Sequence, residues 1–387
     1  MGSKEPAGPA WETPLRALVE RVGAAGAGLR VEAPGIAPIA AGREPERTCV
    51  VLHDRAAVEA LLRGDHLALA EAFLEQRVDV AGDLRAVLAV TDHLDLGPPS
   101  RLATWAWRAR LLLDRRRLGR HSIAFHYDRP PEFFLAWLDR TRSYTHGLYA
   151  APDDDLTTAQ ERKLDRAIDA LGLAPGQEVL DVGCGWGSFL EHAGERGIRV
   201  QGITLSHEQH RFVSERIREK NLPCRVELVD FLDYRPDRRF DAAVFMGSLE
   251  HIPDTRHLAR FVARHLHPHA RIWADFVTSR EGPIAGAFLR KYIFPGVSGY
   301  VDLPALVAAL LRSGFNVREL RDDTLSCACT VRDWARALER SHAALAAQYG
   351  EAAVRAFLLY LWSSHHFLES NRTQAYHLVA ARDPGGF

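Results

Sequence analysis

The residues best suited to chemistry lie in one short stretch of this 387-residue chain. Asp181 ends an apolar run and starts a turn with a glycine at every second position, namely Gly183, Gly185 and Gly187. Glycines at that spacing let the backbone approach a ligand that a Cβ atom would repel. The carboxylate of Asp181 can hold a cationic or hydroxyl-bearing part of the same ligand. The stretch therefore predicts a small-molecule site at the end of a strand.

Two other interpretations of this turn stay open: a purely structural turn and a nicotinamide site. Dinucleotide-binding proteins place glycines after their first strand in the pattern G-x-G-x-x-G, with an acidic residue after the second strand. Here the pattern is D-x-G-x-G-x-G, and Ile203 is followed by Thr204, Leu205 and Ser206. The turn looks like the cofactor site of S-adenosylmethionine-dependent methyltransferases, which makes S-adenosylmethionine the expected cofactor.

The elements that position this turn follow from an alternation of strand and helix signals after residue 171. Such alternation favours a parallel, doubly wound sheet, in which ligands bind beyond the carboxyl ends of the strands. We therefore predict an α/β fold, a Rossmann-like class I methyltransferase sheet with a smaller mixed N-terminal domain. The predicted strands of the sheet cover residues 178–181, 199–203, 225–229, 242–246 and 271–276.

The chain length predicts two domains. We place an N-terminal lipid-binding-like domain with a basic linker at 1–120 and the methyltransferase domain at 121–387. Strands at 29–32 and 48–52 and a helix at 55–63 are expected in the first. The arginine-rich segment 105–120 is predicted to be a helix. It could lie on an anionic membrane surface or pack as a linker helix through its tryptophans.

The amino-acid composition limits the classes of partner that this chain is expected to bind. With 47% hydrophobic and 26% charged residues and a net charge of −1, the chain is an ordinary globular protein, and no nucleic-acid partner is implied. The five cysteines have no metal-ligand spacing, so no metal site is expected. Their odd number and the absence of a signal peptide favour reduced thiols in the cytoplasm. No apolar run approaches membrane-spanning length, so we expect a cytoplasmic protein with peripheral membrane contact.

Several further phrases give the chain a resemblance to a known family. They are the glycine turn at 179–187, Gly-Ile-Thr-Leu-Ser-x-Glu-Gln at 202–209, Tyr144-Thr145, Glu250-His251 and the segment 291–296. In their order and spacing along the chain, these phrases resemble those of cyclopropane-fatty-acyl-phospholipid synthases, mycolic-acid methyltransferases and fatty-acyl C-methyltransferases. The resemblance implies methyl transfer to an alkene carbon of an unsaturated fatty-acyl chain, on membrane phospholipid. The resemblance also implies that this transfer forms a carbocation, which loses a proton to give a cyclopropane or a methyl- or methylene-branched product.

The resemblance also implies roles for individual residues. An apolar tunnel for the acyl chain would include Tyr292, Phe294 and Tyr360, although each could equally be ordinary core. Tyr144 would fold over the methionine end of the cofactor, beside the reacting atoms, or simply pack as an aromatic residue. The complete set expected to bind S-adenosylmethionine is Tyr144, Thr145, Asp181, Gly183, Gly185, Thr204, Leu205, Gln209, Asp230 and Phe231.

The sequence departs from the family at the residues that hold the catalytic base. The family holds a bicarbonate ion through a Cys, a Glu, a His and a Tyr, of which only Glu250 remains here. His146 replaces the Cys and Asp275 replaces the His, and Cys327 lies near the Tyr position. A second carboxylate would repel an anion, which argues against bicarbonate. We hypothesise that His146, tuned by Glu250 and Asp275, accepts the proton, because an imidazole with a pKa of roughly 6.5 suits that task. A packing role for His146, with Glu250 bonded to backbone, is the alternative.

Other functions stay open. One is C-methylation of a small secondary metabolite or a carrier-bound acyl group. Another, of a different class, is a catalytically silent lipid-binding paralogue, against which the intact cofactor set argues. The sequence also leaves open a homodimer and a partner reductase that acts on a methylene product.

Overall fold

The computed structural model describes residues 9–26, 28–43, 48–82, 84–91, 129–252, 254–280, 286–294 and 299–382. The chain divides into two compact units, Met1–Ala106 with His342–His366, and Trp107–Ser341 with Phe367–Phe387. Sequence analysis placed 342–366 in the second domain, whereas their contacts group them with the first. The predicted boundary at 120 and the basic segment 105–120 lie outside the described residues. Within the described residues, no helix combines the length and the apolar character needed to cross a membrane.

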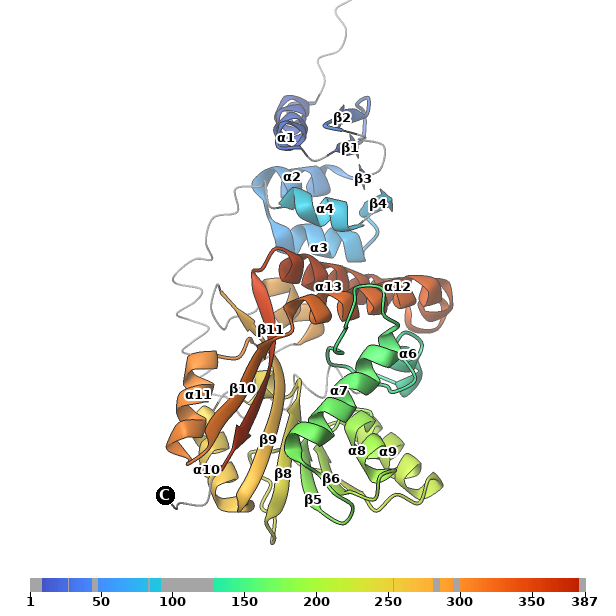
Figure 1. Cartoon of the computed structure of the whole chain (residues 1–387). Coiled ribbons are helices and arrows are strands. Elements are labelled where there is room, and N and C mark those ends of the chain that lie inside the picture. Colours follow the sequence, from blue (N-terminus) through green and yellow to red (C-terminus); the bar gives the residue numbers. More distant parts are fainter. Residues whose placement is uncertain are drawn as a thin grey trace, which may run out of the picture. The chain divides into compact units, whose positions relative to one another are not determined.

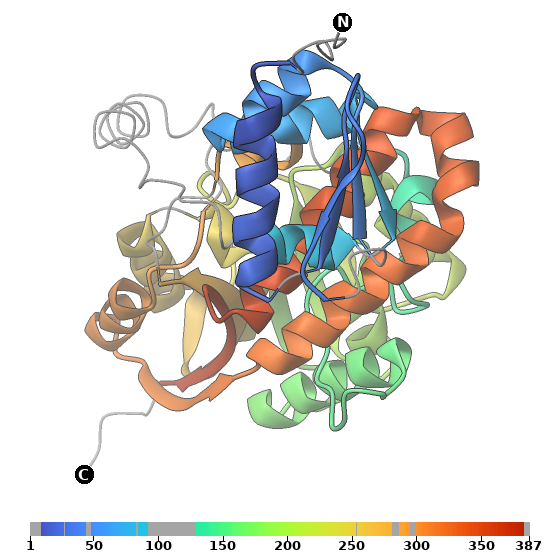
Figure 2. The same ribbon diagram turned by 90° about the horizontal axis from the view of Figure 1, so that it is seen from above.

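The N-terminal unit is a small sheet with helices, as its sequence pattern predicts. The strands at 29–32 and 48–52 and the helix at 55–63 are confirmed. The sheet has the order β2-β1-β3-β4, and α1 lies along it (Figure 2). Its elements are α1 (Glu12–Ala24), β1 (Leu29–Glu32), β2 (Ile39–Ala41), β3 (Thr48–Leu52), α2 (Arg55–Arg63), α3 (His66–Leu74), β4 (Val78–Gly82) and α4 (Leu84–Thr91). Parts of α12 (Thr324–Tyr349) and α13 (Glu351–Glu369) complete it.

The second unit contains a seven-stranded sheet in the order β10-β11-β9-β8-β5-β6-β7 (Figure 1). The five predicted strands are confirmed and run parallel. Two strands were not predicted: β11 inserts antiparallel between β9 and β10, which makes the sheet mixed. The strands are β5 (Glu178–Val182), β6 (Arg199–Thr204), β7 (Arg225–Leu228), β8 (Phe240–Met246), β9 (Leu266–Ser279), β10 (Asn316–Asp322) and β11 (Thr373–Ala381).

Helices cover both faces of this sheet, because its central strands are apolar on both sides. On β8, for example, Val244 packs in one apolar cluster and Phe245 in the other. One face is covered by α10 (Thr255–His265) and α11 (Leu303–Arg312). The other is covered by α7 (Leu156–Leu171), α8 (Ser188–Gly194) and α9 (His207–Glu219). Three short helices complete the unit: α6 (Pro131–Leu135), the 3₁₀ helix η2 (Leu249–His251) and the π-helix η3 (Leu289–Ile293).

Candidate active site

The glycine turn lies where β5 ends, as the sequence predicts. The backbone N–H groups of Gly183 and Cys184 both donate to the carbonyl of Ile203, each at 3.0 Å, which fixes the turn against β6. Gly183 has a φ of +74°, and a Cβ there would lie 2.8 Å from the Cβ of Ser248. A larger residue is therefore excluded by both conformation and space. The turn brings backbone to the edge of a cavity rather than filling it with a side chain.

One cavity brings together every residue expected to bind the cofactor. All ten of them, from Tyr144 to Phe231, line it. Thr204 donates a hydrogen bond of 2.7 Å to Oε1 of Gln209, which orients that amide without an acidic residue at the end of β6. Residues that the sequence analysis did not assign to the cofactor also line the cavity, among them Arg142, Ser143, Trp186, Met246, Ser248 and His251. His251 follows Glu250 in the motif, and burial lowers the pKa of its imidazole to about 4.

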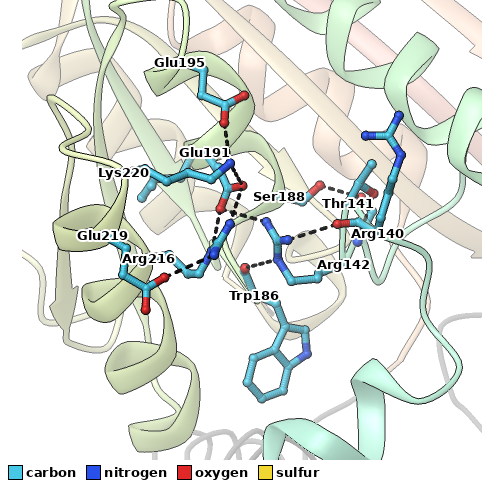
Figure 3. Close-up of polar contacts among 12 residues, drawn as sticks. Arg140, Thr141, Arg142, Trp186, Ser188, Glu191, Glu195, Arg216, Glu219 and Lys220 are labelled. Atoms are coloured by element: carbon cyan, nitrogen blue, oxygen red, sulfur yellow. Dashed lines mark hydrogen bonds and ion pairs between the residues drawn. The ribbon is translucent and has the colours of Figure 1, made fainter.

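The segment before α7 is held over this cavity by an ion-pair network (Figure 3). Glu191 of α8 lies at its centre, with Arg142 at 2.9 Å, Arg216 at 3.0 Å and Lys220 at 2.6 Å. Burial alone would raise the pKa of Glu191, but hydrogen bonds from Arg216 and Lys220 and the charge of Arg142 lower it to about 2. Arg142 adopts a φ of +61°, which is uncommon for a residue with a side chain. The network thus connects the segment that carries Tyr144 to the first helix after the glycine turn.

Tyr144 both lines the cavity and packs in an aromatic cluster. Its ring centroid lies 5.6 Å from that of Phe134, 5.3 Å from Trp137 and 5.2 Å from Trp334. Rings at such distances stabilise one another beyond their buried area. Tyr144 therefore shows both expected features, because it packs with other aromatic residues and also lines the cavity.

Lys163 is a buried cation that sequence reasoning missed. It occupies the inward face of α7 and is 0% exposed. Its ammonium donates to Oγ of Ser143 at 3.0 Å and to Oγ1 of Thr145 at 2.5 Å. Burial lowers its pKa, while the nearby carboxylates of Asp275 and Asp181 oppose that shift. The available signal was a lysine at a helical position where periodicity calls for an apolar residue.

Three carboxyl groups lie in or after strands of the large sheet, Asp181 in β5, Asp275 in β9 and Glu250 in η2, which follows β8. Burial, together with the charge of Asp275, raises the pKa of Asp181 to about 7, and Lys163 opposes the rise. Burial likewise raises the pKa of Glu250 to about 7. Oε1 of Glu250 accepts a hydrogen bond of 2.8 Å from the backbone N–H of Val277. Within the described part of the chain, Oδ2 of Asp181, Oε2 of Glu250 and Oδ1 of Asp275 have no hydrogen-bond partner.

The predicted proton acceptor, His146, is 4% exposed and contacts a different carboxylate from those expected. Its Nε2 lies 3.2 Å from Oδ2 of Asp323, whereas Glu250 and Asp275 were the predicted partners. Hydrogen bonds from His146 and His377 outweigh burial and hold the pKa of Asp323 well below its usual range. An ionised carboxylate only accepts, so Nε2 of His146 donates to Asp323. None of His146, Glu250 and Asp275 is among the residues that line the cofactor cavity.

The residues expected to form the acyl tunnel belong to different compact units. Tyr292 and Phe294 belong to the second unit, in and after η3, and Tyr360 of α13 belongs to the first. Phe294 lies 5.6 Å from His251 between ring centroids, so it borders a cavity residue. Tyr360 packs edge-on against Phe357 at 6.4 Å. The tunnel therefore stays a prediction, and these three residues do not line the cofactor cavity.

Asp181 and the glycine turn fit S-adenosylmethionine. The cofactor carries an ammonium and a sulfonium, and the buried oxygen of Asp181 without a partner can accept from a cationic or hydroxyl-bearing group. The backbone at Gly183 presents no side chain to such a ligand. Thr204 and Gln209 supply neutral hydrogen-bonding groups beside it.

This chain is similar to known proteins over much of its length. The family model described as mycolic acid cyclopropane synthetase matches residues 115–378. A probable fatty acid methyltransferase of Pseudomonas putida is 30% identical over 337 residues, 81% of this chain and 82% of that protein. Cyclopropane mycolic acid synthase 1 of Mycobacterium tuberculosis is 30% identical over 263 residues, covering 62% of this chain and 89% of that protein.

This chain is also similar to a solved structure of a cyclopropane synthase. The cyclopropane synthase MmaA2 from Mycobacterium tuberculosis superposes with a TM-score of 0.63 at 25% identity, over 68% of this chain and 98% of that chain. The family model covers more than half of the chain, and its residues 115–378 include the glycine turn. The chain therefore belongs to the mycolic acid cyclopropane synthetase family of S-adenosylmethionine-dependent methyltransferases.

Proposed function

We propose that this enzyme transfers a methyl group from S-adenosylmethionine to an alkene carbon of an unsaturated fatty-acyl chain, on phospholipid. The observation that carries the proposal is the single cavity that gathers all ten expected cofactor residues in a chain of this family. The names of the relatives, a fatty acid methyltransferase and a cyclopropane mycolic acid synthase, support a lipid acyl chain as substrate.

The cofactor supplies an electrophilic methyl group on a sulfonium. In the proposal the chain's own residues orient it: Asp181 and Gln209 hold its polar groups, and Tyr144 closes over its methionine end. The tyrosine and its aromatic neighbours also exclude water, which would otherwise capture a carbocation. Orientation of this kind brings the reacting carbon and the methyl group into line.

His146 is the proposed proton acceptor. With the proton on Nε2 directed to Asp323, its Nδ1 can take a proton from the substrate cation. Loss of a proton from the new methyl group closes a ring, or leaves a methylene if a hydride shift has first moved the positive charge onto the methylated carbon. Loss from a chain carbon leaves a methylated alkene. A second carboxylate in place of a neutral ligand argues against bicarbonate in this role. His146→Ala that retains full turnover would exclude this assignment.

The function is tested by expression in a host rich in monounsaturated phospholipids, followed by mass spectrometry of the fatty acids. We expect acyl chains that have gained one CH2. A product that resists hydrogenation contains a ring, and one that takes up hydrogen contains an alkene. Cofactor binding with no methylated lipid would favour a silent lipid-binding protein. Methylation of a carrier-bound or small substrate alone would favour the second enzymatic alternative.

A further inference from the structure

The contact between His146 and Asp323 continues into a longer chain of polar side chains. Oδ2 of Asp323 also lies 2.5 Å from Nδ1 of His377. Nε2 of His377 lies 3.1 Å from Oε1 of Glu319. Glu319 in turn forms an ion pair with Arg166 of α7. Five side chains from separate parts of the sequence are therefore connected without a gap.

This chain of contacts runs from the interior to the surface of the second unit. His146, Asp323 and His377 are at most 5% exposed. The side chains of Glu319 and Arg166 are 29% and 39% exposed. The two ends thus differ in access to water, which only the Glu319 end contacts freely.

The contacts also fix where the protons lie. Both nitrogens of His377 face carboxylates, which accept and do not donate, so both carry protons and the ring is an imidazolium. Burial lowers the pKa of His377, but the hydrogen bond and charge of Asp323, with those of Glu319, raise it overall. Trp273 stacks on the ring of His377, with ring centroids 4.6 Å apart. Asp275 of β9 lies opposite His377 of β11 in the strand register.

The carboxylate of Asp323 lies between the two rings, with its Oδ2 3.2 Å from Nε2 of His146 and 2.5 Å from Nδ1 of His377. Its negative charge compensates the charge of His377 in a place where an unpaired charge would carry a large desolvation cost. Because Asp323 accepts from Nε2 of His146, the other nitrogen of that ring, Nδ1, is the one that can accept a proton.

We propose that Asp323 and His377 are positioning residues: the charged His377 keeps Asp323 ionised, and Asp323 holds the Nε2–H of His146 so that Nδ1 of this ring can accept the substrate proton. The inference rests on the proposed function, in which His146 is the acceptor. The substrate C–H bond breaks, its electron pair closes the ring or forms the alkene, and the proton binds Nδ1 of His146. The resting state returns when His146 gives up this proton on product release.

The resting charge distribution is tested without turnover, by ¹⁵N NMR of the histidine-labelled full-length protein at neutral pH. We expect His377 to show two protonated nitrogens and His146 one, on Nε2. In Asp323→Asn the signal of His377 should shift to that of a neutral ring. A neutral His377 in the unmodified protein would overturn the proposal.

Turnover is tested with Asp323→Asn and His377→Gln, using S-adenosylmethionine and vesicles of monounsaturated phosphatidylglycerol. We expect kcat to fall at least 100-fold and 10-fold respectively, the range for loss of acid–base assistance. The KM for S-adenosylmethionine and the Kd for S-adenosylhomocysteine should stay within twofold, which a merely structural role would not leave unchanged. Asp165→Asn is the matched control, because it breaks another Asp–His pair, with His192 at 2.7 Å, and should turn over normally.

The outcomes separate the two proposals. An unmodified enzyme that methylates lipid, together with variants whose kcat stays within twofold, overturns the inference and leaves the function standing. An unmodified enzyme that methylates no lipid contradicts the function, and the NMR result then decides the protonation of His377 independently. A variant that fails to fold is identified by its melting curve, and His377→Gln and the NMR of the unmodified protein still decide.

Discussion

At the scale of single residues, the site is made of charged side chains that burial keeps away from water. Asp181, Asp275 and Lys163 are at most 2% exposed and interact electrostatically. Charges in such a place are costly unless they are compensated. The protein therefore keeps a partly compensated set of charges of which one member, Asp181, lines the cavity where the cofactor, a cation at sulfur, would bind.

Asp181→Asn should weaken the cofactor site and stabilise the fold at high pH. The folded protein raises the pKa of Asp181 to about 7, so it favours the protonated form, whereas the unfolded chain loses that proton near pH 4. The penalty is absent below pH 4, grows as the pH rises to about 7, and is complete above it. The variant should gain roughly 2–4 kcal/mol in unfolding free energy at pH 8 and little at pH 4.

The measurement is urea denaturation of both proteins at the two pH values, with S-adenosylhomocysteine titrated calorimetrically. Its Kd should rise at least tenfold in the variant. Equal stability of the two proteins at pH 8 would mean that Asp181 is not the strained group described above.

At the scale of elements, the site depends on how one segment before α7 is held. Arg142 connects it to α8 through Glu191, and Lys163 of α7 bonds to Ser143 and Thr145. Gln160 of the same helix donates to the carbonyl of Thr145 at 2.7 Å. Two helices therefore fix the residues that border the cofactor cavity.

Arg142→Ala should loosen this segment and weaken cofactor binding about tenfold. Arg142 lines the cavity, and its Nε–H donates to the carbonyl of Trp186 in the glycine turn at 3.5 Å. Arg216→Ala is the matched control, because Arg216 bonds the same Glu191 but does not line the cavity. Both variants should lose about 1–3 kcal/mol of unfolding free energy, the usual range for a bond to a charged group. A Kd for S-adenosylhomocysteine that rises equally in both would contradict the special role of Arg142.

The sequence predicts those structural features that depend on residues close together in the chain. The cofactor turn and the five parallel strands follow from glycine spacing and apolar runs, and both are present. The strand β11 was missed although Ser370-Asn371, with Asn371 at a φ of +56°, forms a turn between α13 and the run Thr373–Ala381. The pairing of His146 with Asp323 could not be predicted, because it depends on side chains 177 positions apart. Contacts of that kind are set by packing rather than by spacing.

At the scale of the whole molecule, the chain crosses between its two compact units more than once. Residues His342–His366 return to the N-terminal unit before β11 completes the large sheet. Arg355 of α13 illustrates the return, because it donates to the carbonyls of Phe73 and Val78 at 2.9 and 3.3 Å and pairs with Asp79 at 2.6 Å. The small unit is therefore built from both ends of the sequence.

Arg355→Ala should destabilise the N-terminal unit and leave the cofactor site intact. Its loss leaves two partly buried carbonyls and the Asp79 carboxylate without this donor, which costs about 2–3 kcal/mol. We expect a lower melting temperature and a Kd for S-adenosylhomocysteine within twofold of the original. Arg63→Ala is a suitable control, because Arg63 forms only an exposed ion pair with Glu59. A melting temperature that falls as far in the control would contradict the assignment.

The central claim is tested most directly with purified protein, S-adenosylmethionine carrying a CD3 methyl group, and vesicles of monounsaturated phosphatidylglycerol. Mass spectrometry then follows both the label and the proton that is lost. We predict that the label enters the acyl chain at a former alkene carbon. Two deuterons retained would indicate a ring or methylene, and three a methylated alkene. Recovery of unlabelled lipid alone, with a protein that binds S-adenosylhomocysteine, would contradict the account.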